Sequence, residues 1–212
     1  MKKAHLFILF IFGIYVQGQD SLTTQTPKFR IGVFTSVDFN LAKKNYPTSA
    51  NTGFDATYNH LNYSVGFIGE YFLLEKISLN VGVNYSNKHL SGLSYCHVCQ
   101  YSMPPPPRTV RLQYFEIPIS ARYYIPLNQV SFFGEVGAVN QFAQGSFSQF
   151  AETKETGYVL GIKLGTGIEL KLTEFMGLQF GVDYQKGLTN LLNYIDVKNE
   201  SVGIKLGFVK SF

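Results

Sequence analysis

The sequence predicts an all-β fold, a transmembrane antiparallel up-and-down β-barrel of about eight strands. Three observations support this prediction. Apolar and polar residues alternate with a period of two through most of the chain after residue 28, which is the period of a β-strand. The connections between these segments are alternately long and short. Only 15% of the residues are charged, against about 25% in a typical soluble domain, so part of the surface is expected to face lipid.

The N-terminus has the organisation of an export signal. Lys2 and Lys3 give a positive start, and the apolar stretch that follows ends by residue 16, which is short for a transmembrane helix. An uncleaved anchor is the alternative interpretation. We expect a cleavable signal peptide at residues 1–18, a periplasmic lead-in at 19–28 and an outer-membrane barrel domain at 29–212.

Eight alternating segments of roughly 10 to 14 residues follow, a length that suits tilted strands crossing a bilayer. Their apolar sets begin at Ile31, Tyr63, Ile77, Phe115, Val130, Tyr158, Met176 and Val202. Long connections at residues 41–60, 87–108, 144–156 and 187–196 alternate with tight turns at residues 74–76, 126–129 and 173–174. In an outer-membrane barrel the short turns and both termini lie in the periplasm and the long loops lie outside the cell, which is the orientation we expect.

The polar faces of the segments indicate which side is the lumen. A soluble barrel puts its apolar set inside, but here the polar set is rich in Gly and Ser, which suit a narrow interior. It also carries charges of both signs: Arg30, Asp38, Glu70, Glu116, Arg122, Glu135, Lys163, Glu169, Asp183 and Lys205. A buried charge without a partner costs several kcal/mol. We therefore expect lipid-facing apolar sets and a sealed lumen in which these charges pair with one another.

The segment around Glu116 gives two further predictions. Glu116 and Arg122 have the same parity, so both are expected in the lumen, with Glu116 paired to Arg122, Lys163 or Lys205. Pro118 lies between them and has no N–H to donate, which usually marks a bulge or a sheet edge.

The C-terminal segment carries apolar residues of one parity and stops at Phe212. Phe208 and Phe212 are typical of the signal that the barrel assembly machinery reads. An ordinary last strand that happens to stop at Phe is the alternative.

Residues 112–124, with the sequence LQYFEIPISARYY, resemble the "YLEIPLLLKY" strand of the PorT-like outer-membrane barrels of the Bacteroidota lineage. Other segments, at residues 66–71, 77–85, 134–137, 161–169 and 183–188, resemble other strands of that family. The resemblance covers residues 29–212 and implies a small barrel in the outer membrane. It does not imply one activity, although PorT itself is associated with type IX secretion.

The second long connection contains Cys96 and Cys99 on either side of His97, followed by four prolines at residues 104–107. Two cysteines in an oxidising compartment favour a disulfide that closes a tight loop. A soft-metal site and an unpaired dithiol are the alternatives, but two cysteines and one histidine leave a zinc site short of its fourth ligand. The prolines are expected to form a stiff polyproline II segment.

No arrangement of residues predicts catalysis. The mature chain has histidines only at positions 60, 89 and 97, and no triad, paired carboxylates or phosphate-binding loop stands out. We therefore expect no catalytic residues, cofactor or metal, and the formal net charge of +4 without a basic cluster argues against nucleic acid.

The expected function is that of a non-enzymatic barrel with a plugged lumen, a structural or partner-binding surface protein acting through its long loops. The expected partners are outer-membrane lipid, the assembly machinery during biogenesis, and an unknown protein or glycan at the loops. An accessory role in protein secretion, a narrow solute channel and a lipid-modifying or proteolytic barrel enzyme are the alternatives.

Overall fold

The computed structural model describes residues 28–41, 45–47, 51–57, 61–99, 106, 108–148, 157–190 and 198–212. The expected signal peptide and its cleavage position lie outside these residues, as does the lead-in apart from Lys28. No helix in the described part of the chain is both long enough and apolar enough to cross a membrane.

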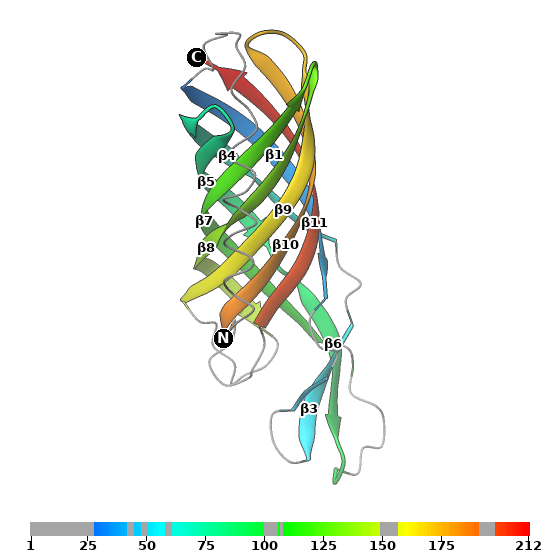
Figure 1. The fold of residues 1–212 in the computed structure, drawn as a ribbon. Helices are drawn as coiled ribbons and strands as arrows, with labels where there is room; N and C mark the ends of the chain where they lie inside the picture. The colour runs from blue at the N-terminus through cyan, green and yellow to red at the C-terminus, as the bar shows by residue number, and fades with distance from the viewer. Residues whose placement is uncertain are drawn as a thin grey trace, which may run out of the picture.

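The described residues form eight long antiparallel strands that close into a barrel (Figure 1). They are β1 (Phe29–Asn40), β4 (Asn62–Leu74), β5 (Ile77–Asn87), β7 (Arg108–Leu127), β8 (Val130–Ser148), β9 (Tyr158–Lys171), β10 (Met176–Asn190) and β11 (Lys198–Ser211). Each strand pairs with the next long strand in the chain, and β1 pairs with β11 to complete the ring. The predicted fold class is therefore confirmed.

The two faces of the strands are the reverse of those in a soluble barrel. Apolar side chains on the outer face are largely exposed, for example Phe67 (63%), Ile204 (58%) and Val136 (57%), while charged side chains such as Arg122 (2%) and Glu70 (1%) are buried inside. An exposed apolar belt around a polar, filled interior is the arrangement of a barrel that lipid surrounds.

Three tight turns close one end of the barrel, which we call the turn end. Two of them have only two residues between the strands: Leu74 pairs with Ile77 in the β4–β5 turn, and Leu127 pairs with Val130 in the β7–β8 turn. Asn128 has a φ of 52°, the left-handed region that such a turn requires and that Asn tolerates better than most residues. The C-terminus lies at this same end (Figure 1).

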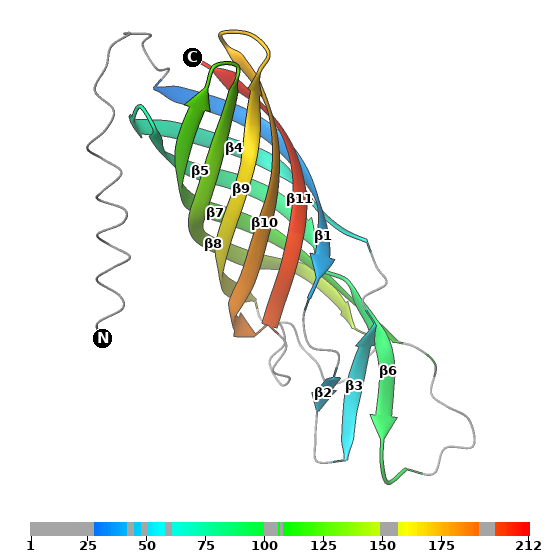
Figure 2. The ribbon, with the colours of Figure 1, turned by 45° about the vertical axis from the view of Figure 1, so that its right-hand side comes forward.

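The opposite end carries an extension that the sequence did not predict. The connections at residues 41–60 and 87–108 contain three short strands, β2 (Asn45–Pro47), β3 (Thr52–Thr57) and β6 (Leu90–Cys96), which we call the arm. Figure 2 shows the arm projecting beyond the barrel, at the end away from the C-terminus. The expectation that these connections hold loops alone was wrong.

The arm forms because β7 and β8 are longer than the expected 10 to 14 residues, with 20 and 19 residues. They stay paired out to Val110 and Ser148, beyond the barrel rim, and β6 pairs with the free edge of β7. Alternation alone did not reveal this because an extended hairpin and a lipid-facing strand have the same period of two.

Pro118 marks neither of the two features that its missing N–H predicts, a bulge or a sheet edge. The β5–β7 ladder is paired at Val81–Ile119 and again at Asn84–Glu116, in an unshifted register. The missing N–H of Pro118 is accommodated by a gap in the ladder at that point, where Gly82 leaves room for the proline ring.

Candidate functional site

A chain of buried ion pairs fills the lumen, starting near the turn end. Arg30, on β1, donates from Nε to Glu70 Oε2 (2.9 Å) on β4 and from Nη1 to Glu169 Oε1 (2.7 Å) on β9. β1 and β9 are not neighbours in the barrel, so the second bond crosses the lumen.

Arg122 continues the chain from β7. Its Nη2 donates to Glu135 Oε2 (2.8 Å), and its Nη1 lies 3.7 Å from Glu70 Oε1. Nη1 also donates to the Tyr124 hydroxyl (2.9 Å), which in turn donates to Glu70 Oε1 (2.8 Å). Arg122 is almost fully buried, so these groups replace the water that would otherwise solvate its guanidinium.

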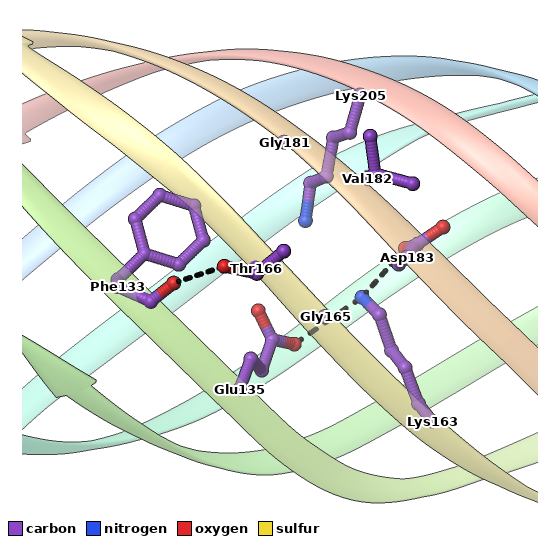
Figure 3. A pocket seen from close by; sticks show the side chains of 9 residues that line it. All are labelled: Phe133, Glu135, Lys163, Gly165, Thr166, Gly181, Val182, Asp183 and Lys205. Atoms are coloured by element: carbon purple, nitrogen blue, oxygen red, sulfur yellow. Dashed lines mark hydrogen bonds and ion pairs between the residues drawn. The ribbon is translucent and has the colours of Figure 1, made fainter.

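Lys163, on β9, completes the chain at Asp183 on β10. Its Nζ lies 3.2 Å from Glu135 Oε1 and 3.1 Å from Asp183 Oδ2, and Figure 3 shows it between the two carboxylates. These groups line a small cavity together with neighbouring residues: Phe133, Glu135, Lys163, Gly165, Thr166, Gly181, Val182, Asp183 and Lys205.

Lys205 lies in the same cavity but stands apart from the ion pairs. Its Nζ is 3.9 Å from the centroid of the Phe34 ring, and no salt bridge of Lys205 is found among the described residues. The alternation of polar and apolar residues predicts Lys205 as a member of the paired network. The structure instead puts its ammonium group against the face of an aromatic ring, a contact that also favours a cation.

Seven of the predicted lumen charges thus form one ion-pair chain, in the order Glu169, Arg30, Glu70, Arg122, Glu135, Lys163 and Asp183. Each of its three cations contacts two carboxylates. A second link crosses the lumen from Arg122 Nη1 to Gln179 Oε1 (3.3 Å), and Gln179 donates to Glu169 Oε2 (2.8 Å). The interior of an eight-stranded barrel is just wide enough for side chains to fill, and here they connect opposite walls.

Glu116 is buried in the lumen but does not pair with any of the three predicted cations. It lies 3.3 Å from Lys88 Nζ, and Gln141 Nε2 donates to its Oε1 (2.6 Å). Lys88 follows the last residue of β5, in a segment that the sequence analysis treated as an external loop. The prediction was wrong because the chain bends at this point and turns the Lys88 side chain inward.

The arm is anchored at the same bend. The side chain of Asn62, at the start of β4, accepts from the backbone N–H of His89 (2.8 Å) and donates to its carbonyl (3.4 Å). Asn87 Oδ1 accepts from the backbone N–H of Tyr63 (2.6 Å). Buried amide groups and the Lys88–Glu116 pair therefore fix the point where β5 ends and β6 begins.

The tip of the arm carries the two cysteines, which the structure joins in a disulfide between Cys96 and Cys99. Within the loop that it closes, Val98 is 70% exposed. The ring of Tyr95 packs over Gly53 of β3, where a Cβ would collide with it, and the Tyr95 and His97 ring centroids are 5.1 Å apart. The tip is thus held by a covalent bond and by ring packing.

The comparisons with known proteins identify the family. The model of the outer membrane protein beta-barrel domain matches residues 17–193. The chain belongs to this family. No curated protein matches the sequence.

The solved structures support the same fold. The outer membrane protein OprG from Pseudomonas aeruginosa aligns with a TM-score of 0.58 at 14% identity, over 88% of this chain and 96% of that one. Neisserial surface protein A aligns at 0.50 with 15% identity, over 87% and 97%. Outer membrane protein W of E. coli aligns at 0.50 with 9% identity, over 90% and 100%. At these identities the likeness concerns the fold alone.

An outer-membrane barrel needs a lipid-facing surface at its closing strand, and Phe208 and Phe212 lie there. Phe208 is 37% exposed on the outer face of β11, and Phe212 follows that strand with 64% exposure. Their role as an assembly signal stays a prediction.

The described part of this outer-membrane barrel holds no group of three His, Cys, Asp or Glu side chains that could bind a metal ion. Ser64, which lies near histidines in the sequence, faces the lumen with its Oγ 2.6 Å from Ser36 Oγ. His60 lies outside the described residues.

Two residues of the lumen cluster escaped the sequence analysis. Lys88 gave no signal, because it falls where the alternation stops. Tyr124 did give one, since it has the same parity as Arg122 and so had to point inward. A tyrosine hydroxyl among charged lumen residues can both donate and accept a hydrogen bond, so a prediction based on charged residues alone does not include it.

Proposed function

We propose that this protein is a non-enzymatic outer-membrane barrel with a closed lumen, which presents the arm on the cell surface to bind a partner protein or glycan. The observation that carries the proposal is the ion-pair chain. It occupies the lumen with paired, buried charges, so within the described part of the chain the surface feature that remains for function at this end is the arm.

The orientation is part of the proposal. Short turns at the turn end and long connections at the arm end support a periplasmic turn end and an extracellular arm, because outer-membrane barrels have this asymmetry. The disulfide at the tip of the arm also suits an oxidising compartment.

A second candidate is an accessory role in protein secretion. The resemblance of residues 112–124 to PorT-like barrels favours it, and these residues lie in β7, which runs from the barrel wall into the arm. Such a role also uses the arm as a docking surface. It differs in predicting that deletion of the protein reduces the amount of secreted cargo.

Two measurements test the proposal. In planar bilayers the purified protein is expected to give no stable conductance, because the ion-pair chain leaves no solute path; steady channel openings would favour a narrow pore instead.

The orientation is tested with single cysteines and a membrane-impermeant maleimide. Gly157→Cys, at the arm end where a Cβ meets nothing within 4 Å, is expected to react in intact cells. Glu174→Cys, in the exposed β9–β10 turn, is expected to react only after the outer membrane is permeabilised. The reverse pattern would overturn the extracellular arm.

A further inference from the structure

β6 has one edge that is fully paired and one that is not. On the first edge, β3 pairs with it from Ser91 to Cys96. On the second edge, β7 pairs only with Leu90, Ser91 and Gly92, because β7 begins at Arg108 opposite Gly92. The outer half of the second edge, from Leu93 to Cys96, has no strand beside it among the described residues.

The hydrogen bonds show which backbone groups face that edge. His97 N–H donates to the Asn51 carbonyl, toward β3, whereas Lys88 N–H donates to the Leu112 carbonyl, toward β7. Backbone groups alternate in direction along a strand. Ser94 and Cys96 therefore direct their N–H and C=O groups toward the edge that no described strand covers.

The sequence explains why β7 does not cover this edge. If the β6–β7 register continued past Gly92–Arg108, Pro106 would lie opposite Ser94 and Pro104 opposite Cys96. A proline has no N–H to donate to a ladder. Consistently, Pro106 is exposed and lies outside any strand. The described β6–β7 ladder accordingly ends at Gly92–Arg108, and Pro106 lies outside it.

We propose that the open edge of β6 accepts an extended segment of a partner polypeptide, which adds a strand to the arm through the backbone groups of Ser94 and Cys96. The inference rests on the proposed function and names the chemistry of the partner. An unpaired strand edge is a template for another strand, and recognition of this kind is made mainly by main-chain hydrogen bonds. The Cys96–Cys99 disulfide holds the end of the edge in place.

A two-fold dimer of the chain with parallel arms does not fit this edge. Two copies in one membrane project their arms on the same side, so their β6 strands run in the same direction and a two-fold axis places Ser94 opposite Ser94. In a parallel ladder, a residue whose N–H and C=O groups point toward the neighbouring strand lies opposite a residue whose groups point away from it. Two Ser94 residues, whose groups both point across, therefore do not pair. We therefore infer that the partner is a different polypeptide.

The test uses the full-length protein in lipid nanodiscs, with a capped octapeptide of alternating Thr and Val as the probe and amide hydrogen exchange as the readout. In the free protein the amides of Ser94 and Cys96 are expected to exchange faster than those of Leu93 and Tyr95, which face β3. Adding the peptide is expected to slow the exchange of the Ser94 and Cys96 amides by about tenfold, the effect of one hydrogen bond of ordinary strength. Ser94 and Cys96 amides already protected in the free protein, or unchanged by saturating peptide, would overturn the proposal.

Variants make the test specific. The double substitution Pro104→Thr with Pro106→Thr restores two N–H groups in register, so β7 is expected to extend, protect Ser94 without peptide and abolish peptide binding. The matched control is Pro105→Thr with Pro107→Thr, whose N–H groups face away from β6 in that register; it is expected to bind like the natural protein. Ser94→Pro removes an edge donor without touching the β3 ladder and is expected to weaken binding, whereas Ser94→Ala is not.

Equal peptide binding by the two double variants would contradict the edge as the docking site. This outcome is distinct from failure of the proposed function, because conductance and maleimide labelling report on the lumen and the orientation independently of any peptide. If the conductance and labelling results agree with the proposed function but the peptide does not bind, the arm binds its partner through another of its surfaces.

Discussion

The barrel and the arm are built from the same kind of strand but held together in different ways. In the barrel, every long strand has a partner on both sides, and the lumen charges are paired across the interior. In the arm, three short strands make a sheet with an incompletely paired edge, and a disulfide and one packed tyrosine stabilise the tip. The long strands of the barrel pair their backbone groups with one another around a closed ring, as a membrane requires. Among the described residues of the arm, one edge of β6 is only partly paired.

This difference indicates where stability and function reside. A substitution inside the lumen disturbs a buried network and should lower the free energy of unfolding of the whole barrel. A substitution in the arm should change the stability of the arm and leave that of the barrel unchanged. Three predictions test that separation, in order of decreasing effect on the barrel.

The largest effect is expected from Arg122→Leu. It leaves Glu135 and Glu70 without their shared guanidinium in a buried site, and removal of one partner from a buried pair costs roughly 3–5 kcal/mol. The measurement is the free energy of unfolding in urea, with the protein in lipid vesicles and the folded fraction read from unboiled gels. Arg111→Leu, at an exposed position of the same strand, is the control and should be close to neutral. Equal losses in both variants would show that the network does not stabilise the barrel.

A smaller effect is expected from Gly203→Ala. A Cβ at this position of β11 would collide with Asp183 Oδ1 and lie 2.6 Å from Asp38 Oδ1, so the two carboxylates must move. Overpacking of this kind costs about 1–3 kcal/mol. Gly134→Ala is the matched control, because nothing lies within 4 Å of its added Cβ. The same urea titration checks both, and an unchanged midpoint for Gly203→Ala would mean that the lumen adjusts freely there.

The smallest effect on the barrel is expected when both cysteines are replaced, Cys96→Ser with Cys99→Ser. Opening a four-residue loop removes about 2 kcal/mol of chain-entropy stabilisation from the arm. Amide exchange at the end of β6 should therefore accelerate, while the urea midpoint of the barrel stays the same. A large fall in the urea midpoint would contradict the division into a self-sufficient barrel and a separately held arm.

Much of the fold could be predicted from sequence because strand alternation is a local property. Arg30, Glu70 and Arg122 were assigned to the lumen from parity alone, and all three lie there. The ion-pair partners of these lumen residues are harder to predict from the sequence than the direction of their side chains. Glu116 was expected to meet Arg122, Lys163 or Lys205 and instead meets Lys88, because partners across a barrel depend on the stagger of strands that alternation does not encode.

The sequence by itself determined the all-β class, the spanning segments and the inward or outward direction of nearly every side chain in them, since each follows from a period of two. The proline run and the two cysteines were also visible, although their use was not. Only the tertiary structure decided which charges meet in the lumen, that Lys88 turns inward, and that parts of two connections form an arm on the edge of β7. These features depend on register and strand length between segments far apart in the chain, and residue alternation carries no record of either.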